Sequence, residues 1–71
     1  MERMPSDMVL RELRKQYPLW MRVELVSMDD PQAPLPGTMG TVMDVDSLGT
    51  IHVRWDNGST LGVVYGIDSV R

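Results

Sequence analysis

Few side chains in this sequence could perform acid–base, nucleophilic or metal chemistry. His52 is the single histidine and there is no cysteine, so thiolate nucleophiles and thiolate metal sites are excluded. His52 alternates with Ile51 and Val53, a pattern typical of a strand with one buried face, which places the imidazole on the outer face. No nucleophile stands at motif spacing from it. We therefore predict a solvent-facing histidine and no enzymatic activity.

The aspartates partly resemble a calcium-binding loop. Asp44, Asp46 and Gly49 match some positions of that pattern. The match fails because Leu48 stands at the fifth position, and because Trp55 stands at the twelfth, where a bidentate glutamate is needed. No glycine-rich phosphate loop is present either. The sequence therefore predicts no metal and no cofactor.

Length and charge limit the classes of protein. Seventy-one residues form one domain near the lower size for a single core, so we expect a free energy of unfolding of about 3 to 5 kcal/mol. Residues 1–27 carry five basic and four acidic groups, and residues 28–71 carry two and six, which gives a net charge of −3. An acidic body disfavours binding of duplex nucleic acid through its phosphates.

The sequence also indicates in which cellular compartment the protein is expected. No apolar run is long enough to span a bilayer, and residues 1–20 lack the apolar middle of a secretory signal. The absence of cysteine agrees with a reducing compartment. We expect a cytoplasmic protein that does not bind a membrane.

The elements that position these side chains are organised around the stretch Gly49 to Leu61. Its apolar residues alternate with polar ones up to Trp55, which is expected in the core. A three-residue loop at Asp56 to Gly58, with Gly58 left-handed, brings the apolar residues of both strands to one face, whereas a two-residue turn would divide them. We therefore predict the bulged loop. The expected cross-strand pairs are Val53 with Leu61 and Ile51 with Val63.

A short amphipathic helix should precede the strands, after a frayed end at Met1 to Pro5. Ser6 or Asp7 is the expected N-cap, and Pro18 ends the helix. So short a helix needs a surface to pack on. We favour the protein's own β-structure, and a partner or a second copy of the chain is the alternative. The apolar stripe of this helix consists of Leu10, Leu13 and Tyr17.

Five short strands are expected after the helix. In the first strand, Val26 and Met28 stand on the opposite parity from the apolar residues before them, which a bend or bulge, or coverage by the helix, would explain. A turn ending at Gly49 would place Val45 opposite Ile51 and Met43 opposite Val53, so that Val42 needs either a bulge or contact with the helix. The expected boundaries are Leu19 to Met28, Thr38 to Asp46, the strand before Asp56, Ser59 to Tyr65 and Ser69 to Arg71, with a proline-rich irregular loop over Asp29 to Gly37.

The pattern predicts a mainly β fold, a small and strongly bent five-stranded barrel preceded by one N-terminal amphipathic α-helix. Residues 1–18 would form the helix and linker, and residues 19–71 the barrel, within one domain. No internal repeat interrupts the chain.

The residues also carry a resemblance that covers nearly the whole chain. It is carried by the segments Lys15 to Pro18, Val23 to Leu25, Ser27 to Pro31, Pro36 to Thr38, Gly40 to Val42, Ile51 to Val53, Trp55 to Ser59 and Gly66 to Asp68. In these segments the sequence resembles domain of unknown function 4314, a small bacterial and phage family. Where that family usually has a glycine after Pro18, this chain has Leu19-Trp20-Met21, so the approach to the first strand is expected to be more apolar. The resemblance implies an SH3-like barrel, often encoded on phages and mobile elements, without an established biochemical role.

Binding surfaces are the better candidates for function. SH3-like barrels often bind ligands at a rim formed by the long loop after the first strand, with aromatic side chains as anchors. The corresponding candidates are Trp20, Asp29, Asp30, Pro31, Leu35 and Tyr65. A second candidate is the helix stripe, Leu10, Leu13 and Tyr17. Five methionines, Met8, Met21, Met28, Met39 and Met43, are expected to fill the core, with an adaptable contact surface as the alternative.

Two functions follow from these surfaces. The preferred one is a protein-interaction module, an accessory protein of a phage or mobile element that binds another protein or a second copy of itself. The alternative is a nucleic-acid-associated module that uses the basic N-terminal segment. Its basic residues are Arg3, Arg11, Arg14, Lys15 and Arg22.

Overall fold

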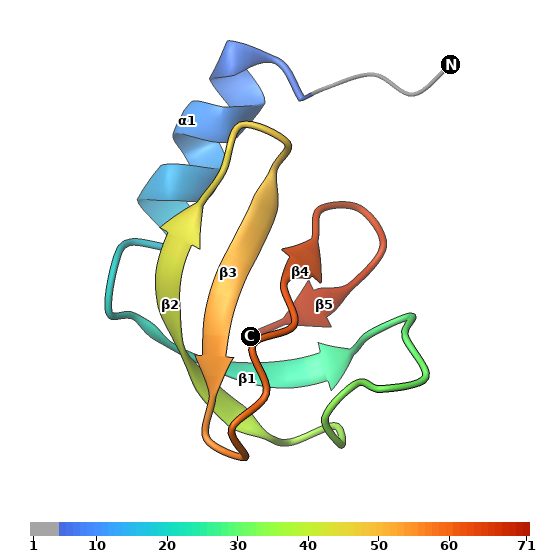
Figure 1. The fold of residues 1–71 in the computed structure, drawn as a ribbon. Coiled ribbons are helices and arrows are strands. Elements are labelled where there is room, and N and C mark those ends of the chain that lie inside the picture. The colour runs from blue at the N-terminus through green and yellow to red at the C-terminus, as the bar shows by residue number, and fades with distance from the viewer. Residues whose placement is uncertain (1–4) are drawn as a thin grey trace.

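The computed structural model describes residues 5–71, so the frayed end expected at Met1 to Pro5 lies, for its first four residues, outside the described part. One helix is followed by five strands (Figure 1). The elements are α1 (Asp7–Gln16), β1 (Arg22–Ser27), β2 (Met39–Val45), β3 (Thr50–Trp55), β4 (Val63–Val64) and β5 (Ser69–Val70). A mainly β fold with one N-terminal helix is therefore confirmed.

Helix α1 begins and ends where the sequence predicts. Ser6 is the N-cap, and its Oγ accepts a hydrogen bond from the Val9 N–H at 3.2 Å. The N–H of Tyr17 donates to the Leu13 carbonyl at 2.8 Å just before Pro18 ends the helix. Leu10 and Leu13 are buried and Tyr17 is half-buried against the core. The helix thus packs on the protein's own sheet, as favoured.

The five strands form one antiparallel sheet in the order β4-β3-β2-β1-β5. Its middle is bent, because Arg22 to Glu24 of β1 pair with β2 whereas Leu25 and Ser27 pair with β5. Figure 1 shows β1 crossing the foot of β2 and β3. The register shifts between Leu25 and Ser27, which is the bend or bulge that the sequence left as one of two alternatives for the first strand.

Barrel closure was predicted wrongly. Within residues 5–71, β4 and β5 are the two edges of the sheet and do not pair with each other. Both strands are only two residues long, and the N–H of Val64 donates to Asp68 Oδ2 at 2.8 Å instead of to a neighbouring strand. The turn between β4 and β5 therefore takes an amide that a closing ladder would need.

The bulged loop between β3 and β4 is confirmed. Gly58 has a φ of 92°, and the Trp55 N–H donates to the Ser59 carbonyl at 2.9 Å. Ile51 lies opposite Val63, as predicted. Leu61 is half-buried, and regular pairing is confined to Val63 and Val64, so the fourth strand is shorter than expected.

Strand β2 contains a bulge that the sequence left as one of two alternatives. Val45 lies opposite Ile51 as predicted, but Val42 and not Met43 lies opposite Val53. Met43 is the extra residue, and it shifts the parity so that Val42 and Val45 both point into the core.

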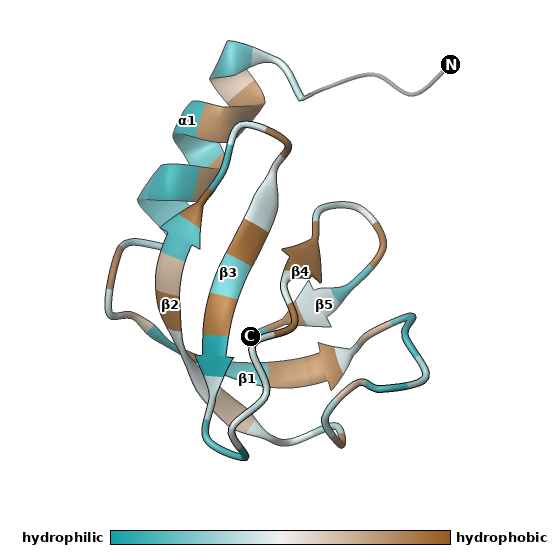
Figure 2. Ribbon diagram, in the orientation of Figure 1, coloured by the Kyte–Doolittle hydropathy of each residue, from teal (hydrophilic) through white to brown (hydrophobic). Residues whose placement is uncertain are grey.

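The core is built from aliphatic residues of α1 and the sheet around one tryptophan. Figure 2 shows apolar and polar residues alternating along β3. The methionines were predicted wrongly, because Met8, Met21 and Met39 are exposed and the other two described methionines are half-buried. No helix in residues 5–71 is long and apolar enough to cross a membrane. The main buried cluster is Leu13, Val23, Leu25, Val42, Val45, Ile51, Val53, Trp55 and Val63.

Gly40 allows β2 and β3 to approach each other inside the sheet. A Cβ at this position would lie 2.5 Å from Val53 Cγ1 and 2.7 Å from Trp55 Cε3. We predict that Gly40→Ala lowers the free energy of unfolding by about 1 to 3 kcal/mol, measured by urea denaturation, because the core must shift to admit the methyl group. Asp44→Ala, on the exposed face of β2, is the control and should change it by less than about 0.5 kcal/mol. Equal stability of the Gly40→Ala and wild-type proteins would contradict this packing.

Asp46 organises the turn between β2 and β3. Its Oδ1 accepts from the Leu48 and Thr50 N–H groups at 2.9 and 3.0 Å, and its Oδ2 lies 2.8 Å from His52 Nε2. The hydrogen bond to His52, assisted by the two backbone donors, holds the pKa of Asp46 below its usual value.

This lowered pKa makes stability depend on pH in one direction. The contribution of Asp46 is present above the unfolded-state pKa of about 3.9 and is lost as the pH falls through the lower folded-state pKa. We predict that Asp46→Asn reduces the loss of thermal stability below about pH 4, whereas Asp44→Asn leaves it unchanged. Identical acid profiles for Asp46→Asn and the wild type would exclude this role.

Candidate functional site

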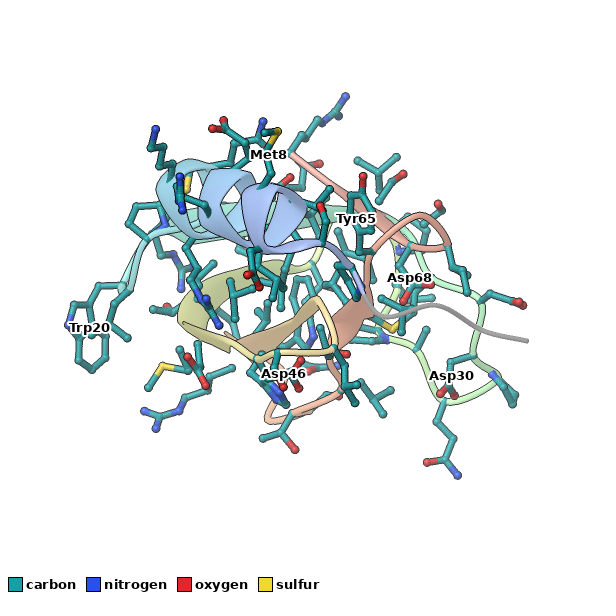
Figure 3. The ribbon with its side chains drawn as sticks, turned by 90° about the horizontal axis from the view of Figure 1, so that it is seen from above. Met8, Trp20, Asp30, Asp46, Tyr65 and Asp68 are labelled. Carbon is teal, nitrogen blue, oxygen red and sulfur yellow. The ribbon has the colours of Figure 1, made fainter. Side chains whose placement is uncertain are left out.

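A groove lies between α1 and the turn that joins β4 to β5. The turn is closed by two amides, because the N–H groups of Ile67 and Asp68 donate to the Val64 carbonyl at 3.1 and 2.9 Å. Gly66 permits the reversal with a φ of 83°. Tyr65 then lies beside the first turn of the helix, on the same side of the molecule as Met8 (Figure 3).

We call this feature the helix–turn groove. It has a volume of about 410 Å³. A second hollow of about 220 Å³ adjoins it, since both are lined by Leu13, Gln16 and Tyr65. The groove is lined by Met8, Val9, Glu12, Leu13, Gln16 and Tyr65.

The exposed walls of the groove are apolar. The side chain of Met8 is 72% exposed, and that of Tyr65 is 52% exposed. Leu13 closes the floor from the buried side of α1. A methionine and a tyrosine that line one groove supply an adaptable and a rigid apolar surface, the two kinds of side chain that protein-binding sites favour.

The charged residues of the groove are acidic. Glu12 lines the main groove and Asp68 lines the adjoining hollow, and no lysine or arginine among residues 5–71 lines either one. Glu12 is only loosely paired, at 3.7 Å, with the exposed Lys15. The groove therefore suits a positively charged ligand better than a negatively charged one.

Asp68 also fixes the shape of this region. Its Oδ2 accepts from the Val64 N–H at 2.8 Å, and its Oδ1 accepts from the Asp29 N–H at 2.9 Å. One carboxylate thus ties the β4–β5 turn to the start of the long loop between β1 and β2. The turn that carries Tyr65 is held in place by this double contact.

The six residues expected to form one rim do not lie together. Figure 3 shows Trp20 and Asp30 at opposite sides of the molecule. Asp30 Oδ1 accepts from the Gln32 N–H at 2.8 Å and stabilises its own loop. Asp29, Pro31 and Leu35 are exposed on the same long loop as Asp30. Of the six, only Tyr65 lines the helix–turn groove.

The expected helix stripe is covered by the chain itself. Leu10 and Leu13 are buried and Tyr17 is half-buried against the core. The exposed face beside the stripe is the one that lines the groove. Sequence reasoning missed this face although Met8, Glu12 and Gln16 recur at intervals of four, the spacing of one helical side.

Three basic residues of the alternative function, Arg11, Arg14 and Lys15, lie together on α1, whereas Arg22 lies on β1. Arg14 Nε and Nη2 donate to the Val45 carbonyl at 3.3 Å. Arg22 lies on β1, where its Nη1 donates to Asp56 Oδ1 at 2.8 Å. This pairing raises the pKa of Arg22 and lowers that of Asp56. Arg3 lies outside the described residues. A hollow of about 440 Å³ is lined by Asp7, Leu10, Arg11, Arg14 and Lys15.

Among residues 5–71, the histidine considered at the start contacts one carboxylate. His52 is exposed on β3, with its Nε2 beside the Asp46 carboxylate. Within residues 5–71, no group of three or more histidine, cysteine, aspartate or glutamate side chains could hold a metal ion. The helix–turn groove is therefore the feature whose chemistry suggests binding.

Comparisons with known proteins address the family but not the function. Residues 6–71 match the family described as "Domain of unknown function (DUF4314)". The search of curated proteins and the search of solved structures each gave no match. The match begins at the cap of α1 and extends through β5, so it includes every element described above. The chain belongs to the DUF4314 family.

Proposed function

We propose that this protein is an interaction module that binds an apolar, positively charged segment of a partner protein in the helix–turn groove. The observation that carries the proposal is that two exposed apolar side chains, Met8 and Tyr65, line a groove whose one charged residue is Glu12, with Asp68 in the adjoining hollow. Burial of these two side chains would supply affinity, and Glu12 and Asp68 would select a partner that carries lysine or arginine.

The groove has a fixed frame, which favours binding. Leu13 anchors α1 in the core, and Asp68 anchors the turn that carries Tyr65. Because the two walls are held by separate elements of one packed structure, a ligand does not have to order them on binding. Met8 can adapt to the shape of the ligand because its side chain has three rotatable bonds and is exposed.

We further propose that the architecture is SH3-like, with closure incomplete between β4 and β5. The strand order and the short turn before β5 support this assignment. A role as an accessory protein of a phage or mobile element, in the cytoplasm, extends the proposal and rests on the resemblance and composition described at the start.

The interaction proposal predicts a defined ligand preference. Selection from a displayed random peptide library on the purified protein should enrich peptides that combine a large apolar residue with lysine or arginine. Tyr65→Ser should weaken binding of the selected peptides by about tenfold or more, since a buried tyrosine is often an interface hot spot. Isothermal titration with the synthetic peptides measures the change.

Two controls make the test specific to the groove. Leu35→Ser removes an apolar side chain that is 80% exposed on the long loop and should leave peptide affinity unchanged. Glu12→Lys should keep the apolar preference but remove the preference for basic residues. Equal affinity of Tyr65→Ser and the wild type, with both proteins folded, would contradict the proposal.

The nucleic-acid alternative predicts a different result. Of its basic residues, Arg14 and Arg22 already contact Val45 and Asp56, so we expect no binding of labelled DNA or RNA duplexes and single strands at low salt. Fluorescence anisotropy measures this directly. Saturable binding at low salt that weakens steeply with added salt would favour the alternative.

A further inference from the structure

Trp20 combines a left-handed backbone conformation with an exposed side chain. Its φ is 75°, in the left-handed region that disfavours large side chains. The flanking backbone is held to β2, because the Trp20 N–H donates to the Val42 carbonyl and the Val42 N–H donates to the Met21 carbonyl, both at 2.8 Å. The side chain is nevertheless 63% exposed and projects from one side of the molecule (Figure 3).

A hollow of about 200 Å³ lies next to this tryptophan, between the end of α1 and the end of β2. Leu19, the residue before Trp20, forms part of its wall, but Trp20 itself does not line it. The remaining apolar walls come from Tyr17, Pro18, Met43 and Val45. Trp20 follows Leu19 directly and its N–H is hydrogen-bonded to Val42, the residue before Met43, so the backbone of this tryptophan adjoins the hollow.

The polar groups of the hollow suit an indole. Arg14 lines it, and its guanidinium is fixed by the Val45 carbonyl at 3.3 Å. A fixed guanidinium can lie over an aromatic face as a cation–π partner. Asp44 also lines the hollow, and its carboxylate can accept the single hydrogen bond that an indole N–H donates. Apolar walls, one cation and one acceptor are the groups that a tryptophan side chain would use.

We propose that two copies of this chain associate about a two-fold axis, with Trp20 of each copy entering the hollow of the other. A second copy fits because each copy carries both the exposed indole and the hollow in adjacent positions, so that one rotation satisfies both contacts at once. Arg14 and Asp44 would each meet the partner's indole, so no like charges need to be opposed. The contact does not use Met8 or Tyr65 and is independent of the peptide-binding proposal.

The contact surface is small, so association should be weak and should depend on concentration. Sedimentation velocity between about 10 μM and 1 mM, which spans binding free energies of about −7 to −4 kcal/mol, tests it. We expect the wild-type sedimentation coefficient to rise toward that of a dimer. Over the same range, the fluorescence emission of Trp20 should shift to shorter wavelength as the indole leaves water.

Trp20→Gly is the decisive variant because glycine accepts the left-handed conformation. It should remain monomeric at every concentration while keeping its fold, which the buried Trp55 reports as the remaining tryptophan. Asp44→Ala should raise the dissociation constant about fivefold, as expected for the loss of one hydrogen bond. Leu35→Ser, on the other side of the molecule, and Tyr65→Ser should associate as the wild type does.

Three results would each overturn the proposed dimer. The first is a wild-type protein that stays monomeric up to about 1 mM. The second is a Trp20→Gly protein that associates like the wild type. The third is loss of association in Leu35→Ser as well as in Trp20→Gly, which would indicate nonspecific hydrophobic aggregation.

Discussion

The packing of Trp55 against Gly40 is the contact on which the rest of the structure depends. Trp55 ends β3 and is 1% exposed. It lies directly opposite Gly40 of β2, where a Cβ would collide with its ring. Its Nε1–H donates to the Leu61 carbonyl at 2.9 Å. One side chain therefore fills the bend of the sheet and also binds the segment that returns toward β4.

The binding surfaces lie where this core stops. The small core covers the inner sides of α1 and the sheet but leaves large apolar side chains outside, among them Met8, Trp20 and Tyr65. Hydrogen bonds hold the backbone near two of these residues, with Asp68 in the turn that carries Tyr65 and with Val42 beside Trp20. A short chain can in this way keep exposed apolar groups on rigid elements, which favours binding because less ordering is needed.

Local signals in the sequence predicted the parts of the fold that depend on neighbouring residues. Left-handed glycines at positions 49 and 58 set both hairpin registers, and the serine cap set the start of α1. For β2, the sequence left two explanations for the position of Val42, because nothing local distinguishes a bulge at Met43 from contact with the helix. Closure was predicted wrongly because the sequence does not show whether β4 and β5, the two ends of the sheet order, will meet, and each strand is only two residues long.

The candidate site was less predictable than the fold. Tyr65 and Leu13 were identified as candidates, but Met8, Glu12 and Gln16 were not recognised as one wall, since the sequence does not show which side of a helix will face a distant turn. The number of methionines suggested that they fill the core, but none of the described methionines is fully buried. Trp20 showed no local sign of a left-handed backbone, because tertiary hydrogen bonds to Val42 impose it.

Proton NMR of the folded protein tests the central contact most directly. We predict strong nuclear Overhauser effects between Trp55 Hε3 and the Gly40 α-protons, with those α-protons shifted upfield by the indole ring. Absence of these effects, with Gly40 α-protons at unperturbed chemical shifts, would contradict the packing from which the bend of the sheet follows.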